Sequence, residues 1–433
     1  MLTSRQWRCL LPGASAVALA TSAQAGAFQT QEFSVEGLGR ANAGEAAAIG
    51  PQSLWWNPAA VGRAPRQISL ALHERLASSD LRDQGSTITR PIPPAGLTTP
   101  VGGPASVKDA TADVTLPAFG LSAPLGDGLA LGLAVTHPFH LKSVLPTDAW
   151  TRYDTIRNRI DVTSVQVGLA AQVTDWLDLG AAVDAQHMTA FLDTAAPNLN
   201  PAAPDGVQRL RGTRWNFGWT VGAQAQLESV RVGLSYRSEV RHRLRGQLSL
   251  SGLQPPLDAA NFSAPAETRF STPWAVALAA RWQITPELTL NGQVVRTGWS
   301  KYDVIEVAFA GTSADILQGH RDTNSIAAGA DYALSGDWTV RGGVQYDPTP
   351  TRNFAREPGV PDGDRWIYAI GASRRLGAKA RLDAALAYTD FQDAAILDDN
   401  VFYAGTPAQT AAPLRGRFDG HLLTFSLGLN WDF

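Results

Sequence analysis

The chain has 433 residues, of which 36 are basic and 39 acidic, and its formal net charge is −3. This slightly acidic chain lacks the excess of basic residues that nucleic-acid binding requires, so we expect no nucleic acid as a partner. After the N-terminal region no segment reaches about 18 consecutive apolar residues, which excludes a bundle of membrane-spanning helices.

Residues 1–25 have the pattern of an export signal. Arg5 and Arg8 precede a short apolar run, and Ala23-Gln24-Ala25 is a small-residue cleavage site. The only cysteine lies before the apolar run, whereas a lipoprotein cysteine would follow it. We therefore expect an exported mature chain with no lipid anchor, no disulfide and no thiolate metal site.

The segment that follows the signal, residues 26–65, is rich in Ala and Gly and has no period of two. It precedes a long array of alternating strands, so we predict that it folds as a hatch inside a barrel formed by residues 66–433. Its glycines allow tight backbone paths, Arg40 can bond to barrel carboxylates, and an Asn before Pro favours a turn. The candidate hatch residues are Phe28, Gly37, Gly39, Arg40, Asn57, Pro58 and Ala59. For Phe28 we expect packing inside the hatch rather than contact with a ligand.

The segment 214–227 shows the alternation most clearly. Trp215, Phe217 and Trp219 lie on one face, and Arg214 and Asn216 lie on the other. In a membrane barrel one face of each strand meets lipid and the other meets the lumen. Aromatic residues near strand ends favour a membrane barrel over a secreted soluble β protein, which is the alternative for the same pattern.

Fourteen segments have the character of strands, and their connections alternate between short turns and long loops. The predicted strands are 66–77, 113–124, 129–141, 155–173, 176–191, 211–227, 230–246, 268–284, 287–309, 321–334, 337–347, 364–376, 379–391 and 417–433. Among the predicted long loops are 310–320 and 392–416. Bacterial barrels have short periplasmic turns and long outer loops, so we predict an all-β, 14-stranded antiparallel transmembrane barrel in the outer membrane, surrounded by its lipid. An alternating last strand that ends in Phe433 resembles the signal read by the barrel assembly machinery.

The first mature stretch, FQTQEFSVEGLGRANAGEAA followed by Asn57-Pro58-Ala59, resembles the hatch of the FadL family of outer-membrane transporters for long-chain fatty acids and related hydrophobic compounds. Further similarities follow in order along the chain. They include LPAFGL at 116–121, Pro138-Phe139, RGGVQYDPTP at 341–350 and VPDGDRW at 360–366.

The resemblance implies a route in which a ligand is captured at the outer loops, passes to an inner pocket and leaves sideways at an inward kink of the third strand. Pro138 falls in the predicted third strand, where it cannot donate to the ladder. The candidate lateral opening is therefore Pro138, Phe139 and His140, although Pro138 could also simply end the strand. The family usually has Gly where this chain has His140.

A hydrophobic ligand with a carboxylate needs an apolar cleft and one or two cationic donors. We expect five arginines to face the lumen, and with Tyr236 they form the candidate ligand-binding set: Arg214, Arg237, Arg241, Arg281 and Arg341. Glu239 and Asp347 are expected on the same face. The alternative for each arginine is an ion pair with a lumen carboxylate.

These observations predict passive uptake of a hydrophobic small molecule, with long-chain fatty acid first and aromatic hydrocarbon second. A general diffusion porin is the alternative of a different class. The chain has neither G-x-S-x-G nor H-E-x-x-H, and its seven histidines are scattered, so we expect no enzyme, no metal and no cofactor. A barrel that carries its own hatch can work as a monomer.

Overall fold

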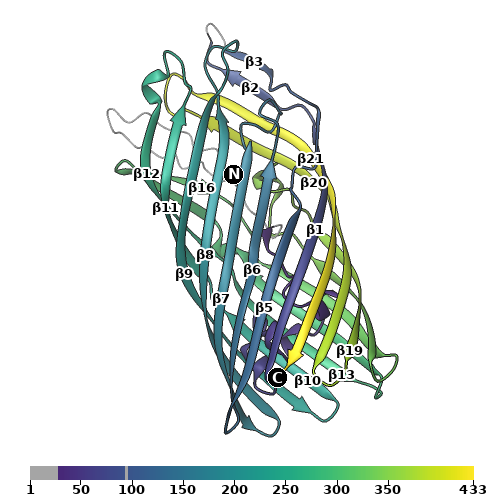
Figure 1. Cartoon of the computed structure of the whole chain (residues 1–433). Helices are drawn as coiled ribbons and strands as arrows, with labels where there is room; N and C mark the ends of the chain where they lie inside the picture. The colour runs from purple at the N-terminus through teal and green to yellow at the C-terminus, as the bar shows by residue number, and fades with distance from the viewer. Residues whose placement is uncertain (1–27, 93–95) are drawn as a thin grey trace, which may run out of the picture.

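A computed structural model describes residues 28–92 and 96–433, which form a closed barrel of 14 antiparallel strands (Figure 1). The first strand, β1 (Gln67–Asp83), pairs with β5 (Val114–Gly126) on one side and with β21 (Thr410–Asp432) on the other, and this second pairing closes the barrel. The predicted fold class is confirmed. The predicted export signal, residues 1–25, lies outside the described residues.

Several barrel strands are interrupted, so the numbered strands outnumber those of the wall. The wall continues from β5 through β6 (Leu129–Val144), β7 (Arg157–Thr174), β8 (Leu177–Ala196), β9 (Gly206–Leu227), β10 (Val230–Arg237) with β11 (Val240–Ser251), β12 (Phe262–Thr272) with β13 (Trp274–Gln283), β14 (Leu288–Gly298) with β15 (Val304–Phe309), β16 (Thr312–Leu317) with β17 (Thr323–Ala333), β18 (Trp338–Asp347), β19 (Arg365–Leu376) and β20 (Ala380–Phe402). The first outer loop carries β2 (Thr87–Arg90), β3 (Leu97–Pro100) and β4 (Ser106–Lys108), and single turns of 3-10 helix occur at η5 (Asp258–Ala260), η6 (Trp299–Lys301) and η7 (Asn353–Ala355).

The strands reach farther at the outer end than predicted. β20 continues to Phe402, and β21 begins at Thr410, so the long loop predicted at 392–416 shrinks to a short connection. The long loop predicted at 310–320 is wrong, because β15 and β16 form a hairpin whose turn is Ala310-Gly311. Both turn residues have positive φ, 46° and 81°, as a tight two-residue hairpin turn requires.

The outer wall presents an apolar band of exposed Leu, Val and Phe side chains, bordered by aromatic residues at both ends. At the end with the short turns the exposed tryptophans are Trp176, Trp282, Trp338 and Trp431. Near the other edge of the band the exposed aromatic residues are Trp215, Trp219, Tyr236 and Trp366. Such a band between two aromatic belts fits a strand barrel in a bilayer. None of the helices among residues 28–92 and 96–433 is long and apolar enough to cross a membrane.

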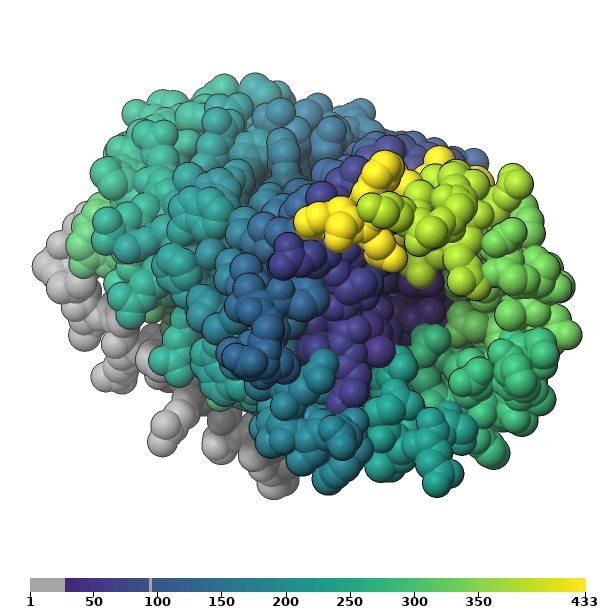
Figure 2. All heavy atoms as spheres, turned by 60° about the horizontal axis from the view of Figure 1, so that its bottom comes forward, coloured from purple at the N-terminus to yellow at the C-terminus, as the bar shows by residue number. Residues whose placement is uncertain are grey.

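Residues 28–65, the described part of the segment predicted to be a hatch and called the hatch below, lie inside the barrel. Figure 2 views the end with the short turns and shows the N-terminal segment seated between strands from several sides of the barrel. It contains α1 (Val35–Leu38), η2 (Glu45–Ala47), η3 (Pro51–Ser53) and η4 (Pro58–Val61). Helix α1 starts at Ser34, whose side-chain oxygen accepts a hydrogen bond from the Gly37 backbone N–H. Each element is short because Gly, Pro and Asn interrupt it, and each packs on a different part of the wall.

Candidate functional site

The hatch is held by a buried ion network centred on Asp331 of β17. The guanidinium groups of Arg341 and Arg281 lie 3.0 and 3.1 Å from its carboxylate, and that of the hatch residue Arg40 lies at 3.6 Å. Arg40 also pairs with Glu45 of the hatch. Two of the arginines predicted for ligand, Arg281 and Arg341, therefore belong to the network that joins hatch and wall.

A second carboxylate, Glu36 of the hatch, extends this network toward β20. It lies 2.9 Å from Arg381 and 3.5 Å from Arg341. Burial alone would raise the pKa of Glu36, but Arg381, Arg341 and Arg40 outweigh it and hold the pKa well below its usual range. The hatch carboxylate therefore stays ionised and paired at neutral pH.

Asn57 joins the hatch to the wall with its side-chain amide. The Oδ1 atom accepts from the Ala59 N–H at 3.0 Å and so caps η4, while the Nδ2 atom donates to the carbonyls of Ala46 at 2.7 Å and Ala223 at 3.0 Å. Because Ala223 belongs to β9, this one side chain organises the hatch and anchors it.

The predicted hatch glycines lie where a side chain would not fit. A Cβ on Gly39 would lie 3.0 Å from the Cα of Gly371 in β19, so the hatch and wall backbones meet directly there. A Cβ on Gly37 would lie 2.6 Å from the Glu45 carboxyl carbon. Pro58 and Ala59 pack so closely on Gly180 of β8 that a Cβ there would overlap their backbone.

An inner pocket lies between the hatch and the wall, beside the aromatic side chains of Trp55, Trp56, Phe139 and Trp299. Arg237 of β10 lines it, donates to the Trp55 carbonyl and places its guanidinium carbon 3.4 Å from the centre of a Trp55 ring. It also lies 3.3 Å from the carboxylate of Asp184. Of the five predicted arginines, Arg237 is the one that reaches this pocket.

A second, apolar pocket lies in the lumen nearer the outer end. Its lining comes from seven strands and the residue after η6, and includes Ile160, Met188, Leu210, Leu244, Phe270, Tyr302, Ile305 and Ile316. Phe28, at the start of the described hatch, packs below it against Phe139, Trp299 and Tyr302, with ring centres 5.3 to 5.9 Å apart. Phe28 thus packs as expected, although against the wall.

Arg214 lies on the inward side of β9 between these two pockets. Its register partner on β8 is Met188 of the apolar pocket, and two residues along that strand Gln186 lines the inner pocket. The side chain is half-buried, and it makes no ion pair with any residue in 28–92 or 96–433. Among the lumen-facing arginines of the predicted set, Arg214 is therefore the one whose charge the described residues leave unbalanced.

Two predicted site residues face the wrong way for the lumen. Tyr236 is 37% exposed on the outer wall, and the side chain of Arg241 is 81% exposed and pairs with Glu239 at 2.8 Å. The expectation that Arg241 and Glu239 share the lumen face is wrong. The other expected carboxylate, Asp347, does line the inner pocket, where Arg365 pairs with it at 2.6 Å.

The cause is a bulge between β10 and β11. Arg237 pairs with Thr220, and Arg245 pairs with Thr213, so the second strand has one more residue than β9 over this interval. An extra residue shifts every following side chain to the opposite face. For this reason a strict period of two predicts the correct face of the barrel for Arg237 and the wrong face for Arg241. Tyr236 lies before the bulge and faces outward by the ordinary alternation, because its neighbour Arg237 faces inward.

The wall has a pairing gap, which we define as the interval between 114–118 of β5 and 136–141 of β6. The last register pair of these strands is Phe119 with Val135, after which β6 pairs only with β7 and β5 only with β1. Above the gap, Ala112 donates to the Lys142 carbonyl at 2.8 Å and closes the wall again.

The hatch covers this pairing gap from inside. The Thr30 N–H donates to the carbonyl of Pro138 at 3.0 Å, its hydroxyl donates to the carbonyl of His137, and Gln29 forms an isolated bridge with Phe139. The same stretch of β6 carries a register shift against β7 between Thr136 and Phe139. Pro138 therefore lies at an irregular, inward-bonded part of the strand and does not end it, since β6 continues to Val144.

His140 belongs to the β6 side of the gap, but its side chain is held against β7. Its register partner on β7 is Asp161, and its Nδ1 atom lies 2.6 Å from the carboxylate of that residue. The neighbouring Phe139 points inward and lines the inner pocket. The imidazole ring of His140, at the position where the family usually has Gly, is thus held against β7, while the side chain of Phe139 lies at the pairing gap.

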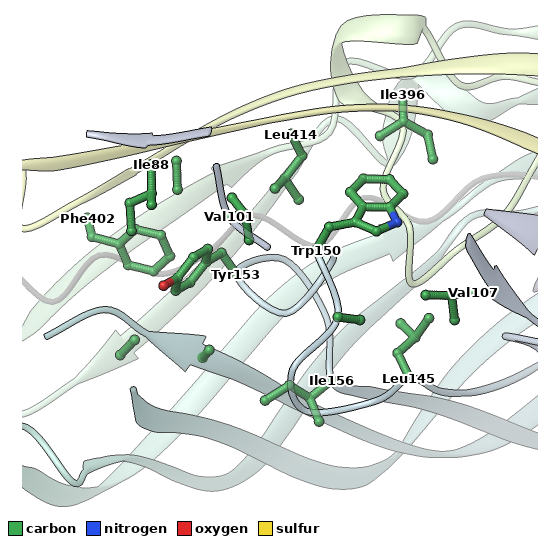
Figure 3. Close-up of a cluster of buried hydrophobic side chains, with 14 of the residues drawn as sticks. Ile88, Val101, Val107, Leu145, Trp150, Tyr153, Ile156, Ile396, Phe402 and Leu414 are labelled. Atoms are coloured by element: carbon green, nitrogen blue, oxygen red, sulfur yellow. The ribbon is translucent and has the colours of Figure 1, made fainter. Parts of the chain in front are cut away.

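The outer loops cover the top of the lumen with a buried apolar cluster. Figure 3 shows Trp150 and Tyr153 of the loop after β6 among side chains from β2, β20 and β21, including Ile88, Phe402 and Leu414. Trp150 and Tyr153 are fully buried. Access to the lumen from outside therefore requires these loops to move.

Below this cluster the carboxyl groups of Asp154, Glu357 and Asp398 are buried close together. Burial, and then the charges of Asp154 and Asp398, raise the pKa of Glu357 well above its ordinary value. The buried site favours the protonated form of Glu357. The contribution of this carboxyl to the stability of the folded loops is therefore complete below about pH 4, where the carboxyl of an unfolded chain titrates, and is lost as the pH rises through the raised pKa.

We predict that the loop cluster loosens as the pH rises above the range of an ordinary carboxyl, about pH 4, and that Glu357→Gln reduces this change, because the amide of Gln stays uncharged at every pH. Hydrogen exchange of residues 146–156 and 353–363 measures the opening. The exposed Glu287→Gln in a short turn is the matched control. An unaltered pH dependence in the Glu357 variant would show that other groups control the loops.

Comparison with known proteins gives a consistent result. The family described as "Outer membrane protein transport protein (OMPP1/FadL/TodX)" matches the chain over residues 16–433. A "Long-chain fatty acid transport protein" of Escherichia coli O6:H1 is 26% identical over 460 residues and covers 97% of both chains. "Outer membrane protein P1" of Haemophilus influenzae is 27% identical over 425 residues, which are 87% of this chain and 88% of that one.

Solved structures share the fold. The crystal structure of a Pseudomonas aeruginosa FadL homologue superposes with a TM-score of 0.81 at 23% identity, and covers 94% of this chain and 99% of that chain. The toluene transporter TodX of Pseudomonas putida gives a TM-score of 0.68 at 16% identity, over 94% of this chain and 100% of that chain.

Proposed function

This chain belongs to the FadL and TodX family of outer-membrane transport proteins, and from that premise we propose that it takes up long-chain fatty acids passively. The observation that carries the proposal is the sequence of sites in the lumen: an apolar pocket, the unbalanced charge of Arg214, and an aromatic inner pocket that ends at the pairing gap. A general porin has a polar, water-filled lumen and needs none of these features.

We infer the following order of events. The outer loops open and admit the acyl chain to the apolar pocket, where burial of apolar surface favours it by about 25 cal/mol per Å². The carboxylate meets Arg214 and then Arg237 as the ligand descends to the inner pocket. Binding there must favour a displaced hatch over the seated one, because a ligand shifts only those equilibria in which it binds one state better.

The lateral exit is the last step of the proposal. Displacement of residues 28–31 would break the bonds of Thr30 to the irregular part of β6 and uncover the pairing gap. The bonds that would be lost are few, and Phe28 would withdraw from Phe139 at the same time. An acyl chain could then pass between β5 and β6 into the membrane without crossing the hatch anchored at Asp331. No covalent chemistry is needed, so we infer that the protein is not an enzyme.

We predict that Arg214→Met weakens oleate binding by about 10- to 100-fold, because a charge-assisted hydrogen bond contributes about 1.5–3 kcal/mol. Binding of the uncharged oleyl alcohol should change little. Intrinsic tryptophan fluorescence of the purified barrel measures both ligands, since Trp55, Trp56 and Trp299 border the inner pocket.

Arg241→Met is the matched control, because this arginine lies on the outer wall and should leave both affinities unchanged. Equal loss of oleate and oleyl alcohol in the Arg214 variant would contradict carboxylate recognition there. Saturable binding of neither ligand by the unaltered protein would favour the porin alternative.

An aromatic hydrocarbon is the second candidate ligand. The rings of Trp55, Trp56, Phe139 and Trp299 around the inner pocket support it, since they can pack on a flat apolar molecule. Saturable toluene binding without oleate binding would favour this candidate over the fatty acid.

A further inference from the structure

The outer wall carries a group of basic side chains on one side of the barrel, above the apolar band. They lie on β6, β7, β9 and β11, and β8 runs between β7 and β9, so that these five strands are neighbours in the wall (Figure 1). The outward-facing cations there are Lys142, Arg157, Arg159, Arg209, Arg211, Arg243 and Arg245. None of them faces the lumen, so the transport route does not account for them.

Five of these cations line a shallow groove on the wall, which we call the basic groove: Lys142, Arg157, Arg159, Arg211 and Arg245. Phe191 lies in its centre, with the guanidinium carbons of Arg157 and Arg211 5.2 and 4.8 Å from its ring centre. Gly212 and Gly246 also line the groove. No Asp or Glu is among the described residues that line it.

Neighbouring carboxylates balance only part of this charge. Arg157 pairs with Asp193 at 2.6 Å, Arg159 pairs with Asp161, and Arg245 lies 3.4 Å from Glu267. Within residues 28–92 and 96–433, Lys142 and Arg211 make no ion pair. The groove therefore keeps a local excess of positive charge, concentrated around Phe191.

The far side of the barrel is different. There the outward face of β20 and β21 carries exposed carboxylates, namely Asp390, Asp393, Asp399 and Asp419. The basic groove is thus a local feature and not a general property of the barrel rim.

The surface below the groove is suited to acyl chains. On the same strands the exposed side chains toward the short-turn end are apolar, including Val167 and Leu169 of β7, Val183 of β8 and Phe217 of β9. Trp215 lies between the two zones. Cations are costly within the hydrocarbon region, so the groove lies at the headgroup level of the outer leaflet, next to lipid.

We propose that the basic groove binds the phosphorylated sugar headgroup of an outer-leaflet glycolipid, with the acyl chains of that lipid on the apolar surface below. Arginine forks bind phosphate with two parallel hydrogen bonds, and a compact ammonium such as Lys142 adds charge. Phe191 holds the guanidinium groups of Arg157 and Arg211 in place at the centre of the groove. The site is on the outside of the wall and does not depend on which ligand uses the lumen.

The test uses the purified full-length barrel, stripped of lipid, titrated with diphosphoryl lipid A, with the dephosphorylated lipid and with inorganic phosphate. Native mass spectrometry counts the bound molecules. We expect the double variant Lys142→Gln, Arg211→Gln to bind diphosphoryl lipid A at least about tenfold more weakly, since each change removes a charge-assisted contact. Arg211→Lys, which keeps the charge, should retain most of the affinity.

Arg417→Gln is the matched control, because Arg417 is an outward-facing cation of β21 on the far side and should have no effect. Equal affinity of the double variant and the unaltered protein would overturn the proposal, as would equal affinity for the phosphorylated and dephosphorylated lipid. Inorganic phosphate that binds as tightly as the lipid would show a simple anion site and would overturn the glycolipid assignment.

Discussion

A barrel that lacks residues 26–63 should conduct ions in a planar bilayer at least about tenfold better than the intact protein, because a barrel of this size without a hatch encloses an aqueous channel. The hatch fills the barrel and contacts the wall on several sides: α1 packs on β19 and β20, η2 on β10 and β13, and η4 on β7, β8 and β9. Its removal should leave the closed ladder of strands intact, since β1 pairs with β21 independently of the hatch.

A milder variant tests the same point without deletion. Asp331→Asn leaves Arg40, Arg281 and Arg341 without their common carboxylate, and breaking a buried ion pair costs about 3–5 kcal/mol. We expect brief openings in single-channel records. Arg296→Gln breaks an exposed pair with Asp322 on the outer wall and should leave the barrel closed. Unchanged conductance after deletion of the hatch would show that the outer loops around Trp150 seal the lumen instead.

The fold could be predicted from the sequence because the alternation of apolar and polar residues follows directly from the two faces of a strand. The segment 214–227 alternates without interruption in the structure, and Arg214 faces inward as predicted. The exported, cysteine-free, Gly-rich composition and the pattern of short and long connections led to the same barrel. The outer ends of the strands were underestimated, because loop-like composition at 392–402 continues as paired strand.

Faces beyond a bulge could not be predicted in the same way. Nothing in the sequence Ser238-Glu239 indicates a bulge. The extra residue relative to β9, which turns Arg241 outward, is defined only by the register of the two strands. The pairing gap is hidden for the same reason. Pro138 indicated an irregular third strand, but the loss of pairing with β5 depends on where that neighbouring strand continues.

The sequence indicated that Arg40 would bond to a barrel carboxylate, as it does with Asp331, but it did not give the partners in the ion network. Glu36 and Asp331 lie far apart in the chain, and both carboxylates went unnoticed as partners for Arg281 and Arg341. The number of arginines predicted to face the lumen did indicate that carboxylates lie nearby, since buried cations need carboxylates as partners. Asn57 was predicted well, because an Asn before a Pro has a local reason to cap a turn, and its bond to Ala223 then follows.

Closing the pairing gap should abolish uptake. Ala118 and Thr136 are the next positions after the last register pair, Phe119 with Val135, and both lie on the lumen side. The only cysteine of the chain, Cys9, lies in the predicted export signal, so cysteines at these two positions would be unique in the mature protein. We expect a short cleavable cross-link between them to lower oleate uptake at least about tenfold, because the proposed route leaves the inner pocket through the pairing gap.

The control for this prediction is a cysteine pair at Leu121 and Leu133. These residues already face each other in the intact ladder between β5 and β6. A cross-link there adds the same chemistry to the same strands but closes nothing, so uptake should continue.

The most direct test of lateral exit compares oleate uptake by cells that carry the cross-linked Ala118→Cys, Thr136→Cys barrel before and after a reductant cleaves the link, with oleate binding to the purified protein measured in parallel. The proposed route predicts that uptake is blocked while the link is present and returns when it is cleaved, with binding unchanged throughout. Uptake that continues through the cross-linked barrel would contradict lateral exit at the pairing gap and would place the exit elsewhere.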